Sequence, residues 1–342
     1  MKIKINIGVT IGDVNGIGLE IFAKFLISNY FHKIENKAQI TLFGNEASIF
    51  RYFKTLDNSD ILMKGLEKTL NNKQIEIVNI ETQPEINFGK VSKEAGKLAL
   101  ESISTALEHY SKNTIDCLVT LPICKESVQM NLPDFVGHTE FIAKYFKVES
   151  PLMTFVYRKL RICLLTIHIP LSRVNTIINR KLIIRQAKIF WESLQNDFGI
   201  KNPKIAILGL NPHAGENGLI GHEEKETFSQ AIESLKKQRI QIEGAFPSDG
   251  FFAFKFYKKF DGIIACYHDQ GLIPFKILSK GEGVNFTANI PLVRTSPDHG
   301  TGFDIAGKNI ANFQSLKNAI NTALQITKQR RKKSRNPITL LT

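Results

Sequence analysis

Short apolar runs alternate with longer stretches of helical periodicity along most of the chain. The runs are bounded by glycine, proline or polar clusters, which predicts strands at residues 5–10, 39–43, 74–78, 115–121, 152–157, 161–167, 204–208, 241–245, 262–267 and 284–289. Apolar spacing of three and four predicts helices ending near residues 27, 52 and 257, and helices at 92–110, 137–145, 181–197, 222–237, 272–278 and 313–332. This alternation is typical of an α/β fold with parallel strands. The short connection at 158–160 predicts a hairpin instead.

Three of the predicted strands are followed closely by a histidine. The strand at 204–208 leads into a polar turn containing His213, and the strands ending at 167 and 267 are followed by His168 and His268. The carboxyl ends of parallel strands open onto one edge of a sheet, so these imidazoles can converge although they are far apart in sequence. Three imidazoles would suit zinc, cobalt, nickel or iron, and magnesium only with further oxygen ligands. The alternative is that each histidine caps its strand or packs against a loop.

The length and the cysteines indicate a two-domain protein of a reducing compartment. A chain of 342 residues suffices for two domains. Its four cysteines lie in or beside apolar runs without C-x-x-C spacing, which predicts reduced thiols and a cytoplasmic location. The apolar runs are shorter than a membrane span, and the first residues alternate like a strand, so we expect neither a membrane anchor nor a signal peptide.

The net charge of +13 is unevenly distributed along the chain. Six positive charges fall in the last turn of the predicted terminal helix and the tail beyond it: Lys328, Arg330, Arg331, Lys332, Lys333 and Arg335. The remaining positive charge suits an enzyme of acidic, phosphorylated ligands. A nucleic-acid-binding protein is the alternative from another class, but interleaved aromatic residues and a recognisable binding module are missing, so we expect no specific nucleic acid partner.

Four separated motifs point to one enzyme family. They are Gly-His-Thr-Glu at 137–140, Asn-Pro-His-Ala-Gly-Glu at 211–216, Tyr-His-Asp-Gln-Gly at 267–271 and Arg-Thr-Ser-Pro-Asp-His-Gly-Thr at 294–301. In this order, over nearly the whole chain, they resemble the 4-hydroxythreonine-4-phosphate dehydrogenase family of vitamin B6 biosynthesis. The resemblance implies an NAD-dependent, metal-assisted oxidation of 4-phosphooxy-L-threonine. The β-keto acid product then loses carbon dioxide and leaves 3-amino-2-oxopropyl phosphate.

The resemblance also implies roles for single residues. It assigns the metal, which would be zinc, cobalt or magnesium, to His168, His213 and His268. It assigns substrate binding to a further set: His138, Thr139, Lys276, Asn285 and Arg294. The family is a homodimer with a shared active site, in which the last metal histidine comes from the partner subunit.

Two aspartates are candidates for catalysis. Asp249 and Asp269 lie in predicted loops near the histidine-bearing strands, where a carboxylate could orient a ligating imidazole or take the proton of the substrate hydroxyl. Loop aspartates also form turns, and this alternative remains open for both.

A second resemblance concerns the cofactor. The dinucleotide fingerprint G-x-G-x-x-G is missing from the glycine-rich turn at 12–20. The segment 299–307 is similar to the adenosine loop of isocitrate and isopropylmalate dehydrogenases, which also lack that fingerprint. This implies that NAD, or NADP, is bound by five residues: His299, Gly300, Thr301, Asp304 and Gly307.

The same resemblance implies the architecture, which is two α/β/α domains flanking a cleft. We expect one α/β domain from residues 1–130 and 290–342, and an inserted domain at 131–289 that carries the metal histidines and the dimer contacts. Close relatives oxidise 4-phosphoerythronate, 4-phosphothreonate or dihydrodiols, and the motifs do not separate these substrates.

Overall fold

The computed structural model describes residues 4–57 and 59–335, and it has the mixed α/β fold that the sequence predicts. The chain divides into two compact units. The first unit comprises Met1–Glu149 and Ile290–Thr327, and the second comprises Ser150–Asn289 and Lys328–Thr342. This division differs from the expected one because the first break lies after Glu149 instead of residue 130, and the end of the chain belongs to the second unit. Within the described residues, no helix has both the length and the apolarity that crossing a membrane requires.

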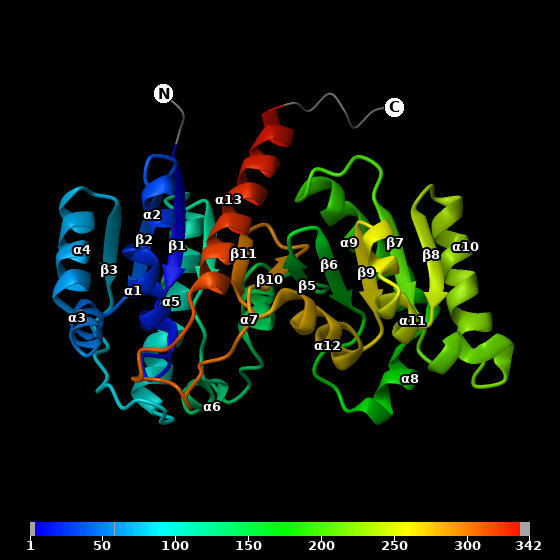
Figure 1. Ribbon diagram of the computed structural model, residues 1–342, viewed down its shortest axis with the longest axis horizontal. Coiled ribbons are helices and arrows are strands. Elements are labelled where there is room, and N and C mark those ends of the chain that lie inside the picture. Colours follow the sequence, from blue (N-terminus) through cyan, green and yellow to red (C-terminus); the bar gives the residue numbers. More distant parts are fainter. Residues whose placement is uncertain (1–3, 58, 336–342) are drawn as a thin grey trace. The chain divides into compact units, whose positions relative to one another are not determined.

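The strands of the first unit lie in the order β3-β2-β1-β4-β11 (Figure 1). Their bounds in that order are Ile75–Asn79, Ala38–Gly44, Ile5–Thr10, Cys117–Thr120 and Val293–Pro297. β1 pairs in parallel with β2 and β4, β2 with β3, and β11 with β4. β4 and β11 are buried along their whole length, as expected for parallel strands covered on both faces.

Side chains cap the starts of some helices of the first unit. The helices of this unit are α1 (Gly18–Leu26), α2 (Asn29–Ile34), α3 (Glu46–Lys54), α4 (Ser59–Asn71), α5 (Lys93–Ser111), α6 (Lys125–Gln129) and α7 (His138–Tyr145), together with the start of α13 (Gln314–Arg335). Asn45 and Ser92 cap α3 and α5 by accepting hydrogen bonds from Ser48 and Ala95. The buried hydroxyl of Ser102 in α5 donates to the Phe43 carbonyl of β2, which joins this helix to the sheet.

The strands of the second unit lie in the order β10-β5-β6-β9-β7-β8. Their bounds in that order are Val284–Ala288, Leu152–Tyr157, Leu160–Leu164, Gly262–Ala265, Lys204–Leu208 and Gln241–Phe246. The expected hairpin is confirmed, because β5 and β6 pair antiparallel; β5 also pairs antiparallel with β10. The pairs β6–β9, β9–β7 and β7–β8 are parallel, so the chain leaves these four strands at one edge of the sheet.

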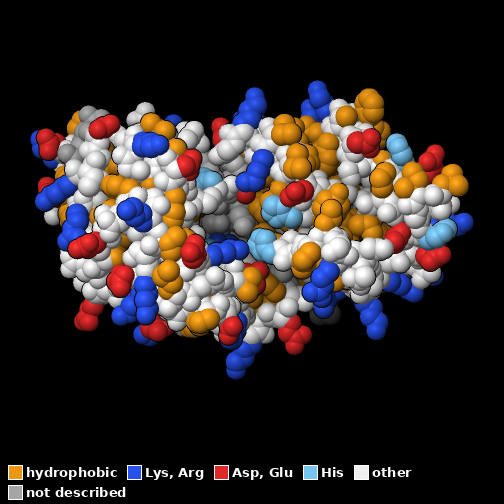
Figure 2. Space-filling view, turned by 90° about the horizontal axis from the view of Figure 1, so that it is seen from below, with side chains coloured by type: hydrophobic (Ala, Val, Ile, Leu, Met, Phe, Trp, Pro, Cys, Tyr) orange, Lys and Arg blue, Asp and Glu red, His pale blue; other side chains and the backbone are white. Residues whose placement is uncertain are grey.

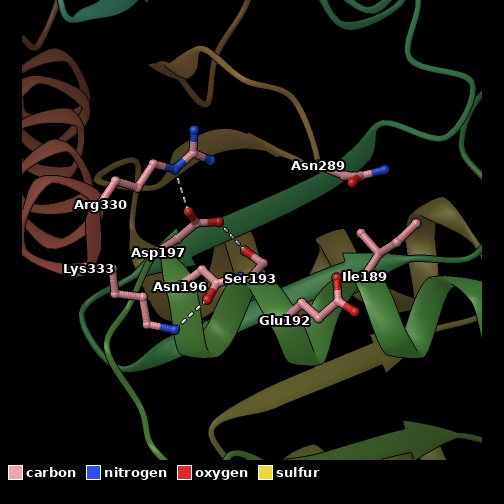
Figure 3. Close-up of a pocket in the computed structure, with 8 residues that line it drawn as sticks. All are labelled: Ile189, Glu192, Ser193, Asn196, Asp197, Asn289, Arg330 and Lys333. Carbon is pink, nitrogen blue, oxygen red and sulfur yellow. Dashed lines mark hydrogen bonds and ion pairs between the residues drawn. The ribbon is translucent and has the colours of Figure 1, made fainter. Parts of the chain in front are cut away.

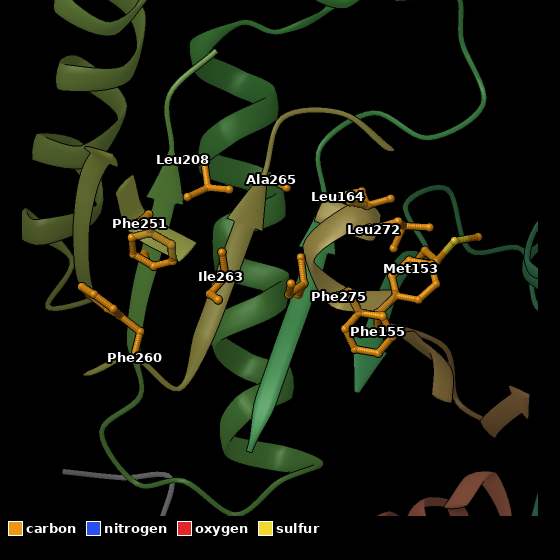
Figure 4. Close-up of a cluster of buried hydrophobic side chains, with 12 residues drawn as sticks. Met153, Phe155, Leu164, Leu208, Phe251, Phe260, Ile263, Ala265, Leu272 and Phe275 are labelled. Carbon is orange, nitrogen blue, oxygen red and sulfur yellow. The ribbon is translucent and has the colours of Figure 1, made fainter. Parts of the chain in front are cut away.

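Helical segments connect these strands. They are η1 (Leu171–Arg173), α8 (Val174–Ile177), α9 (Arg180–Asn196), η2 (Pro212–Gly218), η3 (Glu224–Phe228), α10 (Ser229–Lys237), α11 (Ser248–Ala253), η4 (Phe256–Lys259) and α12 (His268–Ser279). A hydrophobic cluster fixes the strands against α11 and α12 (Figure 4). In it Phe275 of α12 packs against Phe155 of β5 with ring centroids 5.6 Å apart.

Several element bounds differ from the expected ones. β6 ends at Leu164, before the expected residue 167, and α12 begins at His268 instead of 272. The terminal helix reaches Arg335, so all six basic residues lie within a helix. β11 was not expected, because its sequence Val-Arg-Thr-Ser-Pro is mostly polar although every residue in it is buried. A buried polar strand lacks the apolar run by which strands are predicted.

Candidate active site

Arg294 is a buried cation at the centre of the first unit's candidate site. It lies on β11 opposite Leu118 of β4, and only 2% of the residue is exposed. Its Nε and Nη2 atoms donate to the Thr120 hydroxyl oxygen at 3.1 and 2.6 Å. Burial lowers the pKa of the guanidinium to about 10, and the charge of Glu140 opposes this shift. The side chain is therefore charged at neutral pH and held in place by the end of β4.

His138 begins α7 beside this arginine. Its Nε2 atom is buried and makes no hydrogen bond within residues 4–57 and 59–335. Burial holds the pKa of His138 well below its usual value, and the positive charges of Arg294 and Lys125 lower it further. The imidazole is therefore neutral at neutral pH. A buried polar atom without a protein partner indicates a place for a ligand atom.

Lys125 and Glu140 complete the polar surroundings of His138. A Cβ placed on Gly137 would lie 3.1 Å from Glu140 Oε2 and 3.9 Å from Lys125 Nζ. The first unit thus brings together the predicted residues His138 and Arg294 and adds Lys125. Thr139, also predicted, is buried beside them. These donors suit an anionic group such as a phosphate or a carboxylate.

The candidate histidines lie in the second unit, and two of them are close together. The ring centroids of His168 and His268 are 6.0 Å apart, and both residues line a cavity of about 310 Å³ together with Leu171. His268 Nδ1 lies 2.7 Å from Asp269 Oδ1. With the proton on Nδ1, this contact leaves the Nε2 lone pair of His268 available to a metal ion. The His268 side chain is 42% exposed.

His213 lies apart from that pair. It belongs to η2, where residues 213–217 all have positive φ between 42° and 77°. Asn211 holds the start of this turn, because its backbone N–H donates to Glu224 at 2.7 Å and its side chain donates to Glu223 at 2.8 Å. In the part of the chain that the structure describes, no group of three or more His, Cys, Asp or Glu side chains could hold a metal ion. The metal set of three histidines therefore stays a prediction.

The remaining polar candidates of the second unit lie on three different elements. Lys276 is exposed on α12, and Asp249 is exposed in the first turn of α11. Asn285 lies on β10, and its buried Oδ1 atom has no hydrogen-bond partner among the described residues. The predicted substrate residues are thus divided between the two units.

The predicted cofactor loop lies in the first unit, where the glycine-rich turn before α1 holds it. The Ile17 N–H donates to the Thr301 carbonyl at 2.9 Å, so the glycine-rich turn before α1 supports this loop. Gly307 has φ 77°, and a Cβ there would lie 2.6 Å from the Phe88 ring. A Cβ on Gly300 would meet no atom within 4 Å, so this backbone is accessible. The accessible backbone of this loop suits a ligand that contacts main-chain groups. The positions of the His299 and Asp304 side chains alone do not indicate a cofactor site.

Two residues of the first unit's site were missed from the sequence. Thr120 is the last residue of β4, and Lys125 is the first of α6. A polar residue at the end of a buried strand is a signal similar to the one that identified the histidines, and Thr120 carries it. No such sequence signal marks Lys125, because its place beside His138 depends on contacts between distant segments.

A further polar cavity in the second unit involves the basic end of α13 (Figure 3). Arg330 Nε lies 2.7 Å from Asp197 Oδ1, and the other oxygen of Asp197 accepts from Ser193 at 2.6 Å. Lys333 donates to the Asn196 side chain. Since two of the six basic residues are engaged inside the unit, their presence does not by itself favour nucleic acid binding.

Comparison with known proteins places the chain in a family. The family described as pyridoxal phosphate biosynthetic protein PdxA matches residues 35–323. The chain belongs to the PdxA family. The 4-hydroxythreonine-4-phosphate dehydrogenase of Bacteroides thetaiotaomicron is 39% identical and covers 98% of this chain and 93% of its own. The family expected from the four motifs is therefore confirmed.

A solved structure and a differently named relative extend this comparison. The 4-hydroxythreonine-4-phosphate dehydrogenase from Klebsiella pneumoniae has a TM-score of 0.78 and 28% identity, covering 95% of this chain and 98% of that chain. The D-threonate 4-phosphate dehydrogenase of Cupriavidus necator is 35% identical and covers 95% of this chain and 98% of its own. Proteins named for two different phosphorylated substrates thus resemble this chain at similar identity.

Proposed function

We propose that the protein is an NAD-dependent 4-hydroxythreonine-4-phosphate dehydrogenase. It oxidises the alcohol of 4-phosphooxy-L-threonine to a ketone, with hydride passing to NAD and release of a proton. The β-keto acid then loses carbon dioxide and leaves 3-amino-2-oxopropyl phosphate for pyridoxal 5′-phosphate biosynthesis. The observation that carries the proposal is the group of Arg294, His138 and Lys125 in a PdxA-family chain, because these donors suit an anionic substrate.

Arg294 and His138 have different roles in this proposal. The guanidinium grips two oxygens of a phosphate or carboxylate, and Thr120 holds it in the orientation that this requires. The neutral His138 imidazole offers its buried Nε2 atom to a substrate oxygen. Thr139 in the first unit and Lys276 and Asn285 in the second are the other proposed substrate contacts.

The histidine group fits a divalent metal in part. His168 and His268 supply two imidazoles 6.0 Å apart, measured between ring centroids, and Asp269 orients the second ring. When bound, zinc, cobalt or magnesium would supply Lewis acidity that lowers the pKa of a coordinated alcohol. His213 is the proposed third ligand, and Asp249 remains the candidate acceptor of the hydroxyl proton.

The cofactor part of the proposal rests on the accessible loop. His299, Gly300, Thr301, Asp304 and Gly307 would bind the adenosine half of NAD, and the open space at Gly300 supports a close approach of a ligand to the backbone. NADP is the alternative, and the same assay compares the two. A cytoplasmic location is part of the proposal, since the four cysteines are free thiols.

A homodimer would complete the histidine site. Exposed apolar side chains lie at this cavity and on the helix that begins with His268: Leu171 is 71% exposed at the cavity that His168 lines, and Ile273 and Ile277 are 57% and 68% exposed on α12. On the face shown in Figure 2, histidine side chains lie among exposed hydrophobic ones. Exposed apolar side chains beside a polar site are typical of a protein interface. We propose that a second copy of the chain covers these side chains and that each histidine site takes His213 and His268 from different chains.

The decisive experiment is a substrate panel. Purified protein with a divalent metal is incubated with NAD or NADP and with 4-phosphooxy-L-threonine, 4-phospho-D-threonate, 4-phosphoerythronate or a dihydrodiol, and reduced cofactor and carbon dioxide are measured. We expect the highest kcat/KM with 4-phosphooxy-L-threonine and NAD. A higher value with another substrate would contradict the proposal.

The second candidate is a dehydrogenase of 4-phosphothreonate. The similar identity of the relative named for D-threonate 4-phosphate favours it. Both substrates carry a phosphate and a carboxylate, so Arg294 would serve either. They differ in the amino group, which only the panel tests.

A further inference from the structure

Gln270 hydrogen-bonds to three separate segments of the second unit. It lies in the first turn of α12 and is 9% exposed. Its side-chain oxygen accepts from the Cys266 N–H at 2.6 Å, and its Nε2 atom donates to the Gly209 carbonyl at 2.6 Å and to the Ser248 hydroxyl oxygen at 2.7 Å. Both N–H groups of the amide and its oxygen are therefore engaged.

Each partner of Gln270 lies next to a candidate site residue. Gly209 follows β7 and leads into the turn of His213, and Ser248 directly precedes Asp249. Cys266 follows β9 and leads to His268. One buried amide thus joins the segments that carry His213, Asp249 and His268.

We infer that Gln270 is a positioning residue that fixes the three loops of the histidine site relative to one another. This inference rests on the proposed function for its link to a metal. An amide is required because the Gly209 carbonyl needs a donor while the Cys266 N–H needs an acceptor, and a carboxylate supplies only acceptors. Loss of the Gly209 contact would release the start of the His213 turn.

The chain offers a matched control. Gln186 of α9 is also a buried glutamine of the second unit, with 8% exposure, and its side-chain oxygen has no hydrogen-bond partner among the described residues. Gln270→Glu and Gln186→Glu therefore make the same chemical change at similar burial. Only Gln270→Glu removes a hydrogen bond that joins the three loops.

The test combines hydrogen–deuterium exchange with titration of Co²⁺ into the metal-free protein. For Gln270→Glu we expect faster exchange in segments 209–216, 248–253 and 266–270 together, and a Co²⁺ affinity lowered about 10- to 100-fold, as is usual when a group supporting a metal ligand is removed. Gln186→Glu should leave these three segments and the Co²⁺ affinity near wild type.

The outcomes separate this inference from the proposed function. Faster exchange confined to α12, unchanged Co²⁺ affinity in Gln270→Glu, or an equal loss in Gln186→Glu would overturn the positioning role. If the wild type binds no Co²⁺ but the three segments still loosen together, the placement by Gln270 is supported and the proposed metal site fails.

Discussion

The group around Arg294 and the group around His168 differ in how much of a binding site one chain supplies. Arg294 is almost fully buried, with two of its donor atoms fixed by Thr120 on the neighbouring strand. His168 is exposed and His268 is partly exposed, and a third ligand is missing from their surroundings within the described chain. The first group is organised before a ligand arrives. In the second, the two imidazoles alone do not make up the proposed set of three metal ligands.

This difference has an energetic meaning. A side chain held by its own fold loses little further conformational freedom on binding, which favours affinity for the substrate anion. Partly exposed histidines lose more conformational freedom, unless supporting hydrogen bonds such as those of Asp269 and Gln270 have already ordered the segments that carry them. We therefore expect the two regions to respond differently to substitution.

Removing a metal ligand should have the largest effect. Loss of a group that only supports a ligand lowers metal affinity about 10- to 100-fold, so His213→Ala should lower it at least about 100-fold and abolish most turnover. His32→Ala, which changes an exposed histidine of the first unit, is the matched control. Metal titration and turnover with and without a chelator measure this. Full activity of a metal-free sample would refute the metal site.

Arg294→Lys should have the second-largest effect, although it keeps the positive charge. An ammonium cannot grip two oxygens as a guanidinium does, and losing one charged hydrogen bond of roughly 1.5 to 3 kcal/mol should raise the substrate KM about ten- to a hundredfold. Binding of NAD should change little. If NAD affinity falls while the KM stays constant, Arg294 belongs to the cofactor site.

Thr120→Val should have a smaller effect of the same kind. It removes the oxygen that accepts from two atoms of Arg294, and a loss of about 1.5 kcal/mol should raise the substrate KM roughly tenfold with a nearly constant kcat. Thr120→Ser keeps the hydroxyl and should remain close to wild type. Equal kinetics for the two variants would show that the hydroxyl does not orient the guanidinium.

His138 should make stability depend on pH. Its pKa is lowered in the folded state, so below about 6.5 the unfolded chain binds a proton that the folded protein does not. Folding is therefore penalised as the pH falls through that value, and the penalty is absent above it. Between pH 7 and 5.5 the wild type should lose about 1 kcal/mol more stability than His138→Asn.

Urea unfolding of both proteins at the two pH values measures this difference. The other histidines are common to both proteins, so their contributions cancel. Parallel pH profiles would show that His138 titrates in the folded protein as it does in the unfolded chain.

The sequence predicted the fold well where buried strands are apolar and less well where they are polar. The runs at 5–10 and 204–208 predicted β1 and β7 directly. β11 was missed because Arg294, Thr295 and Ser296 are polar yet buried, and the pairing of Arg294 and Thr295 with β4 joins distant segments that no local pattern reveals. The same limit applies to the side chains of the site, which could be predicted only where a local pattern marked them.

Candidate residues could be predicted where a motif or a strand end marked them. The neighbourhood of His168 and His268 was predictable, because both follow adjacent parallel strands. Lys125 and Gln270 could not be assigned roles, since these depend on contacts with distant segments. Any contribution of a second chain likewise lies outside what periodicity within one chain can indicate.

The most direct test of the account is recovery of activity by mixing two inactive variants. His213→Ala and His268→Ala proteins are dissociated, mixed and re-associated, with subunit exchange verified by mass. If each histidine site draws His213 and His268 from different chains, half of the dimers are mixed and one of their two sites is intact, which predicts about one quarter of wild-type activity. No recovery under verified exchange would contradict the shared site and show that each site draws both histidines from one chain.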